Sequence, residues 1–256
     1  MEAAHAHSMI TANVLRNRTA GELTEGERAI LEAAVLETRL LPADQVAVRQ
    51  GEPVNVSILL VHGFMTRRVD AADGRRHLVG VHVPGDFVDL HAYVLKKLDH
   101  DVAALTDATV AIVPHARLER IQSECESLTR RLWFLTLQDA AIHRQWIYRL
   151  SSLNAYQRIA HFLCEINARL LAIGASDGAV FELPMTQVDL GEVCSLTNVH
   201  VNRVLRQLRE NELCTVRASR VEIHDLKALV AAGQFDSQYL FLNQQTAARA
   251  CGLESR

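Results

Sequence analysis

Residues 183–214 limit the fold of this chain more strongly than any other stretch, because they fit two short helices joined by a tight turn. Thr186 can cap the first helix, and Asp189, three residues later, can complete a capping box. Gly191 is small enough to let a second helix approach closely, and Ser195 falls in the turn. The segment therefore predicts a helix-turn-helix.

The second helix of this pair has an apolar inner face and a polar, cationic outer face. Thr197 or Asn198 can cap it. The apolar residues recur at helical spacing, at Val201, Val204, Leu205 and Leu208. The outer side holds Asn198, Val199, His200, Asn202, Arg203, Arg206 and Arg209. Polar and basic residues of this kind can meet base edges and phosphates, so the outer face predicts DNA binding. The alternative is an ordinary helical hairpin with a solvated arginine face.

A predicted β-hairpin follows the two helices directly, over 213–216 and 221–223, and it carries Arg217 and Arg220 at its turn. A hairpin in this place makes a winged helix-turn-helix. Five arginines face two glutamates between positions 197 and 221, although the whole chain has a formal charge of −3. This local basic surface suits electrostatic association with DNA, and its modest charge favours a dimer.

The composition points to a folded chain in a reducing compartment. Its 256 residues suffice for one or two domains with ample core, and 49% of them are hydrophobic. No secretory signal and no apolar run of about 20 residues is visible, so we expect a cytoplasmic protein without membrane contact. The cysteines are odd in number and widely spaced, which is typical of free thiols: Cys125, Cys164, Cys194, Cys214 and Cys251.

The chain before the helix-turn-helix divides into a β-rich part and a helical part. Short β-like runs separated by turns are expected at 39–41, 45–49, 57–62, 64–70, 76–83, 102–105 and 109–113. Asp73-Gly74 between two of them is the strongest hairpin signal. This rhythm predicts an antiparallel sandwich or roll. Helices are expected at 25–36, 115–124, 127–151 and 156–173, with a strand-like run at 180–183.

The helix at 127–151 has an apolar seam of the heptad type, broken by Asp139. At about 25 residues it would span about 40 Å. We therefore expect a self-pairing dimer helix, since a DNA reader with two-fold symmetry needs one, although a core helix would show a similar seam. The predicted dimer-interface residues are Leu128, Leu132, Leu135, Ile142 and Trp146.

The expected organisation is α+β, with five parts. Residues 1–20 form a mobile lead-in, 21–115 an N-terminal antiparallel β-roll of the jelly-roll type, and 116–152 the dimerisation helix region. Residues 153–240 form the C-terminal winged helix-turn-helix, and 241–256 a tail.

This order of parts resembles the Crp/Fnr family of bacterial transcription regulators over about residues 20–240. The residues that carry the resemblance are Leu-Thr-Asn-Val-His-Val-Asn-Arg-Val-Leu at 196–205, Arg158-Ile159-Ala160, and Pro84-Gly85-Asp86-Phe87 in the roll. The resemblance implies a sequence-specific DNA-binding transcription regulator, an activator that contacts RNA polymerase. It would act as a homodimer on double-stranded DNA with a pseudo-palindromic operator.

The resemblance also implies roles for single residues. Arg203 would contact guanine in the major groove, and Thr186 and Gln187 would meet phosphate at a helix N-terminus. One departure is Ser195, where the family's turn usually has glycine; at a positive φ it would cost about 1 kcal/mol. The predicted DNA-binding residues are Thr186, Gln187, Thr197, Asn198, Val199, His200, Asn202, Arg203, Arg206, Arg217 and Arg220.

The roll lacks the residues that name a known effector of the family. Members that bind cyclic AMP hold its phosphate with a glycine-glutamate element and an arginine-serine pair. Here His100 takes the place of the arginine and Asp101 that of the serine, and a carboxylate there would repel phosphate by a few (~2–4) kcal/mol. We therefore do not expect cyclic-nucleotide binding. A candidate pocket for an unidentified small-molecule effector comprises Gly85, Asp86, Asp89, His100 and Asp101.

No cofactor or metal is expected. The oxygen-sensing branch of the family holds an iron–sulfur cluster through N-terminal cysteines, and here no cysteine precedes Cys125. Histidines in or near the roll could ligate haem or a metal, but no pair has the close spacing of a metal site: His62, His77, His82, His91, His100 and His115. His5 and His7 belong to the terminus.

Two other classes of protein are alternatives for this sequence. One is a haem- or small-ligand-sensing regulator of the same fold, or else a sensor or interaction protein without DNA binding. No group on the reading helix would clash with DNA, which speaks against the loss of DNA binding. The other is an enzyme. The chain has no GxSxG, P-loop, strand-linked GxGxxG or HExxH motif, so we do not expect an enzyme.

Overall fold

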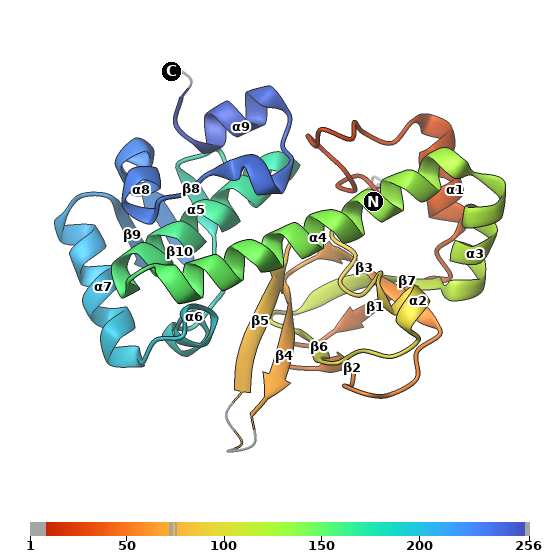
Figure 1. Ribbon diagram of the computed structural model, residues 1–256, viewed down its shortest axis with the longest axis horizontal. Coiled ribbons are helices and arrows are strands. Elements are labelled where there is room, and N and C mark those ends of the chain that lie inside the picture. Colours follow the sequence, from red (N-terminus) through yellow and green to blue (C-terminus); the bar gives the residue numbers. More distant parts are fainter. Residues whose placement is uncertain (1–8, 72–73, 75, 254–256) are drawn as a thin grey trace, which may run out of the picture.

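Two antiparallel sheets, a 27-residue helix and a smaller helical domain follow one another along the chain (Figure 1). They are seen in a computed structural model that describes residues 9–253 except 72, 73 and 75. The long helix, α4 (Glu126–Ser152), crosses the whole molecule and links the sheets to the helical domain.

The β-rich part is a roll of two sheets, as the alternating sequence pattern predicts. One sheet has the order β1-β7-β3 and the other β2-β6-β4-β5. Their strands are β1 (Glu37–Leu41), β2 (Val46–Val48), β3 (Val56–His62), β4 (Met65–Asp70), β5 (Arg76–His82), β6 (Asp101–Ala104) and β7 (Ala108–Pro114). All neighbouring strands are antiparallel, and all seven predicted strands are present.

The sheets enclose a buried apolar core that includes Leu60, Met65 and Val102. β4 and β5 form the predicted hairpin, with Asp70 opposite Arg76. The Asp73 of its turn signal lies outside the described residues.

Helices close one side of the roll. They are α1 (Glu25–Ala33), α2 (Ala92–Leu95), α3 (His115–Glu124) and the first half of α4. Thr24 caps α1 in a capping box with Glu27, as expected, although the helix ends earlier than the sequence suggested. The four-residue α2 was not predicted. A second core, which includes Leu31, Leu118 and Leu128, lies between these helices and the roll.

The prediction of a mobile lead-in is wrong for residues 9–20. Val14 and Leu15 belong to the core between helices and roll, and Thr11 is buried. The side chains of Arg16 and Asn17 donate to the backbone carbonyls of Ile173 and Ala172 at 2.7 Å each. Apolar residues at 14 and 15 thus give this segment a packed position, while residues 1–8, including His5 and His7, lie outside the described part.

The third core fills the helical domain, and it surrounds α5 (Ala155–Ile173). The other elements are β8 (Val180–Glu182), α6 (Gln187–Cys194), α7 (Asn198–Glu210), β9 (Cys214–Arg217), β10 (Arg220–Ile223), α8 (Leu226–Gly233), the 3₁₀ helix η1 (Ser237–Leu240) and α9 (Gln244–Ala250). β8, β10 and β9 form a small antiparallel sheet beside α6 and α7.

Residues 241–253 are packed rather than extended as a tail. α9 begins at an Asn243 cap, and Leu242 and Ala250 are buried in the core around α5. Over the described residues, no helix is both long and apolar enough to cross a bilayer.

Candidate nucleic-acid interface

α6 has the local structure that its sequence predicts. The Thr186 side chain accepts from the backbone N–H of Asp189, and the Asp189 carboxylate accepts from the Thr186 N–H, which completes the capping box. A Cβ on Gly191 would come within 2.7 Å of the Leu196 carbonyl oxygen, so only glycine lets the two helices meet. Ser195 ends α6 in the left-handed conformation, with φ 53° and ψ 51°.

α7 crosses directly after this turn, and Thr197 caps it by accepting from the His200 N–H. Three of its four predicted inner residues are buried and the fourth, Leu205, is half-buried against the same core. The outer residues Asn198, Val199, His200, Asn202, Arg203 and Arg206 are all exposed. Val199 is 78% exposed, which is unusual for an apolar side chain unless a partner covers it.

A hollow of about 610 Å³ runs along this outer face. It is lined by the α6 N-terminus at Gln187, by the outer side of α7 with Arg203 and Arg206, and by β9 with Thr215. Three elements that are separate in the sequence therefore place donors and cations around one concave surface.

The wing is a β9–β10 hairpin, and Arg217 and Arg220 are paired residues across it. Ala218 and Ser219 form its two-residue turn at φ 49° and 62°, the left-handed geometry of a type I′ hairpin. Both arginines are exposed, and the Nε of Arg220 lies 3.1 Å from a Glu222 carboxylate oxygen. The wing thus extends the basic surface of α7.

The structure does not present the predicted dimer-interface residues to a partner. Leu128, Leu132 and Trp146 are buried within the subunit, and the Trp146 Nε1 donates to Glu165 at 3.0 Å. Leu135 and Ile142 are half-buried against the same cores. Three of the five predicted residues, Leu128, Leu132 and Trp146, are thus covered within the subunit, because α4 uses that face to hold the roll and the helical domain.

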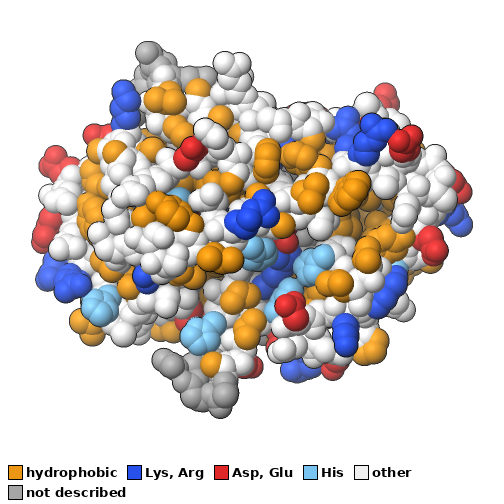
Figure 2. All heavy atoms as spheres, viewed as in Figure 1, with side chains coloured by type: hydrophobic (Ala, Val, Ile, Leu, Met, Phe, Trp, Pro, Cys, Tyr) orange, Lys and Arg blue, Asp and Glu red, His pale blue; other side chains and the backbone are white. Residues whose placement is uncertain are grey.

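A second stripe on α4 is exposed instead. Trp133 is 66% exposed, Leu137 57% and Ile147 67%. With Ala140 and Arg144 they follow intervals of four, three, four and three residues, the spacing of a heptad seam. Figure 2 shows hydrophobic side chains along the line of α4 on the near face of the molecule. A largely apolar groove of about 540 Å³ adjoins Trp133, between α2, α3 and α4.

The predicted effector residues do not form one pocket. Asp86 joins the roll to α5, because its carboxylate accepts from the buried Arg169 guanidinium at 2.5 Å and from the Val83 N–H at 3.0 Å. The pKa of Asp86 is strongly lowered: burial acts to raise it, but Arg169 and His82 outweigh burial. Gly85 has φ 97° and abuts Asn13, so its role is structural.

Asp89 and Asp101 are also used by the roll itself. One Asp89 oxygen accepts from the Ile58 N–H at 2.6 Å, while the other is buried with no partner in the part of the chain that the structure describes. Burial raises the pKa of Asp89 to about 7. Asp101 accepts from the Gln50 N–H at 2.6 Å, in an exposed contact within the roll.

Of the predicted set, His100 lines a hollow. This hollow, of about 490 Å³, lies between the roll and α4 and also contacts Arg67, His91, Asp139 and His143. The His100 Nε2 is buried and has no hydrogen-bond partner among the described residues. Burial lowers the pKa of His91 to about 4. Figure 2 shows histidines gathered around a basic side chain below α4. Among the described residues, no three metal-binding side chains come together.

Arg67 at this hollow was not singled out in the sequence. Its side chain is 3% exposed, and its guanidinium donates to the Val88 carbonyl at 2.7 and 3.0 Å and to Asp139 at 2.7 Å. It therefore ties a turn of the roll to α4. The polar Asp139 in the middle of the apolar α4 pattern was the available signal.

Comparison with known protein families identifies both parts of the chain. Residues 157–232 match the Crp-like helix-turn-helix domain, and residues 38–125 match the cyclic nucleotide-binding domain. Together these segments contain α6, α7, the wing and most of the roll.

Whole proteins with the same order of domains are also similar. The chain is 28% identical over 217 residues to the transcriptional activator protein anr of Pseudomonas aeruginosa, covering 84% of this chain and 88% of that protein. It is 24% identical to an anaerobic regulatory protein of Haemophilus influenzae, covering 81% and 80%. The solved structure of FixK2 from Bradyrhizobium japonicum superposes with a TM-score of 0.70 at 25% identity, covering 77% of this chain and 96% of that one.

Proposed function

The chain belongs to the Crp/Fnr family of DNA-binding transcription regulators, and on this basis we propose that it activates transcription as a homodimer bound to a pseudo-palindromic operator. The exposed, cation-rich hollow between α6, α7 and the wing is the observation that carries the proposal. Each subunit supplies one such surface, so a two-fold dimer would read two half-sites about one helical turn apart.

In this proposal each part of the surface has its own task. α7 enters the major groove, where Arg203 donates to a guanine and Asn202 and His200 meet neighbouring base edges. The N-terminus of α6, with Thr186 and Gln187, holds a phosphate, because the free amides and the helix dipole favour an anion there. Arg206, Arg217 and Arg220 neutralise further phosphates.

The dimer forms through the exposed stripe of α4, with Trp133, Leu137 and Ile147 at its centre. Their high exposure in the single subunit and their heptad spacing support this assignment. Parallel pairing of two α4 helices would place the two helical domains side by side at one end of the dimer.

Contact with RNA polymerase and a place in the bacterial cytoplasm complete the proposal. Relatives named as transcriptional activators support the first. The role is that of a regulator rather than an enzyme. No metal or cofactor is assigned to the roll.

A small-molecule effector is a second element of the proposal, favoured by the hollow at His100. The unpartnered Nε2 of His100 would gain a hydrogen bond from a ligand seated between the roll and α4. Asp99 accepts from the opposite ring nitrogen at 2.7 Å, which leaves Nε2 as an acceptor.

Selection of bound sequences from random DNA, followed by footprinting, tests the function. We expect a protected two-fold site. Arg203→Ala should relax preference at one base pair by about 1–3 kcal/mol, whereas Arg217→Ala should weaken binding to all sequences alike. A protein that enriches no two-fold sequence, or an equal effect of both variants on specificity, would contradict this assignment.

A further inference from the structure

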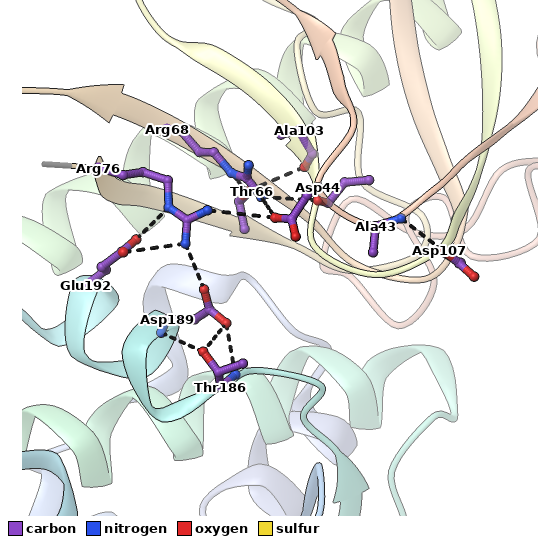
Figure 3. A network of polar contacts seen from close by, with 11 residues as sticks. Ala43, Asp44, Thr66, Arg68, Arg76, Ala103, Asp107, Thr186, Asp189 and Glu192 are labelled. Atoms are coloured by element: carbon purple, nitrogen blue, oxygen red, sulfur yellow. Dashed lines mark hydrogen bonds and ion pairs between the residues drawn. The ribbon is translucent and has the colours of Figure 1, made fainter. Parts of the chain in front are cut away.

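One arginine of the roll reaches across to the helix-turn-helix. Arg76 lies on β5, and Figure 3 shows its guanidinium between the roll and α6. Its Nε donates to Glu192 at 3.0 Å and its Nη2 to Asp189 at 3.1 Å. Its Nη1 lies 3.8 Å from Asp44, which Arg68 holds in turn at 3.1 Å.

The contact falls on the residue that completes the cap of α6. One oxygen of Asp189 accepts from the Thr186 N–H and hydroxyl, at 2.9 and 2.6 Å, and the other accepts from Arg76. The cap of the helix that we assign to a DNA phosphate is therefore held from the roll. Gln187, on another side of α6, lines the hollow, so the contact leaves the DNA-facing side free.

This ion-pair group is more than a weak surface contact. The Asp189 and Glu192 side chains are only 11% and 19% exposed, and Arg76 makes three hydrogen bonds to them. Pairs in open water contribute little, but charge-assisted bonds with several donors on partly buried carboxylates fix geometry more firmly. Arg76 also neutralises two carboxylates on a helix that must approach phosphate.

The other end of α6 is held by the long helix and α5. Arg149 of α4 donates to the Val193 carbonyl at 3.1 Å, and Arg158 donates to that of Cys194 at 3.4 Å. α6 is thus fixed through Val193 and Cys194 to the long helix and α5, and through the side chains of Asp189 and Glu192 to the roll. Contacts with two separate parts of the subunit restrict rotation of α6, whereas a single contact would let α6 rotate about it.

We propose that Arg76 is a positioning residue for DNA reading: through Asp189 and Glu192 it sets the orientation of α6 and α7 relative to the dimer axis, and so the half-site spacing that the protein accepts. The part about spacing rests on the proposed function, whereas the fixed orientation within one subunit does not. Arg76 itself touches no DNA in this assignment.

The orientation is tested without DNA. Two spin labels are attached, one at Leu40→Cys on the roll and one at Gln207→Cys on α7, in a protein in which Cys125 and Cys251 are replaced by serine. When the labelled protein is diluted with unlabelled chain, the labels report the distance between the roll and α7 within one subunit. We expect a narrow distribution for the parent and for Arg39→Gln, a control that removes an exposed arginine of β1. Arg76→Ala should broaden it, and the swap Arg76→Glu with Glu192→Arg should narrow it again. An unchanged distribution in Arg76→Ala overturns the proposal, whether or not the protein binds DNA.

Spacing is tested on the selected operator, on copies with one base pair added or removed between the half-sites, and on a single half-site. We expect Arg76→Ala to bind the original spacing about 5–30-fold more weakly, to lose most of its preference for that spacing, and to bind the half-site within about threefold of the parent. The charge swap should recover the preference. The proposal is overturned if Arg76→Ala loses as much affinity for the half-site as for the full site. It is also overturned if the swap variant folds but does not recover the preference for the original spacing. If no operator is selected at all, the proposed function fails instead, and the label distances still decide on Arg76.

Discussion

At the scale of single residues, the turn of the helix-turn-helix carries a small strain. Ser195 has φ 53°, in the left-handed region where a Cβ crowds the backbone. The residue is exposed, so no buried contact of its side chain offsets the strain. The motif tolerates serine because Gly191, Leu196 and the α7 cap hold the turn from both sides.

Ser195→Gly should therefore stabilise the protein. The gain is the relieved strain, up to about 1 kcal/mol, minus the contribution of the entropy that glycine adds to the unfolded chain. In a protein of this size that is a rise in Tm of roughly 1–3 °C, measured by calorimetry. Ser195→Ala keeps the Cβ and serves as the control without gain. A lower Tm for the glycine variant would show that the strain at Ser195 is smaller than the entropy that glycine adds to the unfolded chain.

Asp89 is a second residue whose surroundings oppose its usual state. Burial raises its pKa to about 7 from an ordinary 3.8, so in the folded protein the carboxyl favours the neutral form. A group whose pKa is raised on folding contributes stability below its unfolded pKa and loses it as pH rises through the folded pKa. Asp89 should therefore oppose folding increasingly between pH 4 and pH 8.

Asp89→Asn keeps the acceptor for the Ile58 N–H and cannot ionise. The free energy of unfolding of the variant relative to wild type should thus rise with pH, by about 1–4 kcal/mol between pH 4 and pH 8. Urea unfolding at several pH values measures this difference. A difference that stays constant over that range would mean that Asp89 does not titrate there.

At the scale of elements, α4 has two apolar faces with different tasks. The face with Leu128, Leu132 and Trp146 is buried against the subunit's own cores. The face with Trp133, Leu137 and Ile147 is open to solvent. Both follow heptad-like spacing, so the sequence pattern alone does not tell which of the two faces the subunit buries.

The two faces should respond differently to substitution. Leu137→Glu should weaken dimerisation at least tenfold while leaving the subunit folded, as measured by sedimentation equilibrium and circular dichroism. Trp146→Ala should instead lower the free energy of unfolding by about 3–5 kcal/mol, because it empties a packed site. Leu40→Glu, at an 81% exposed site of β1, is the control. A dimer that survives Leu137→Glu would exclude the exposed stripe as the interface.

At the scale of the whole molecule, polar contacts join the roll to the helical domain at several points. Arg169 of α5 pairs with Asp86 of the roll in a buried site, and Arg76 pairs with α6 nearer the surface. The segment before α1 adds bonds from Arg16 and Asn17 to the C-terminal end of α5. The roll and the DNA-reading domain therefore form one continuous structure within the subunit.

Removing one partner of the buried Asp86–Arg169 pair should lower the free energy of unfolding more than replacing both partners. Asp86→Ala leaves the Arg169 guanidinium buried without its main partner and should lower the free energy of unfolding by about 3–5 kcal/mol. Adding Arg169→Met removes the unpaired charge, so the double variant should be more stable than Asp86→Ala alone. Denaturant unfolding of the four proteins in this cycle measures both effects. Additive losses would mean that the two residues do not interact.

Local chemistry determined what the sequence revealed correctly. The caps at Thr24, Thr186 and Thr197 and the alternation of the strands are properties of neighbours in the chain. The helix-turn-helix could be predicted for the same reason, because Gly191 and the turn belong to one short segment. Roles at the DNA surface could be proposed because that surface is built almost entirely from this segment and the wing.

Only the tertiary structure decided which groups from distant segments meet. In it Asp86 pairs with Arg169, Asp139 with Arg67, and Asp189 with Arg76. The partners of these three carboxylates lie 72 or more residues away in the sequence. It also chose which apolar face of α4 is buried, because the face that contacts the roll depends on where the sheets pack rather than on the heptad pattern. The spacing of apolar residues along a helix shows that one of its faces is apolar. Which surface covers that face depends on how the rest of the chain packs.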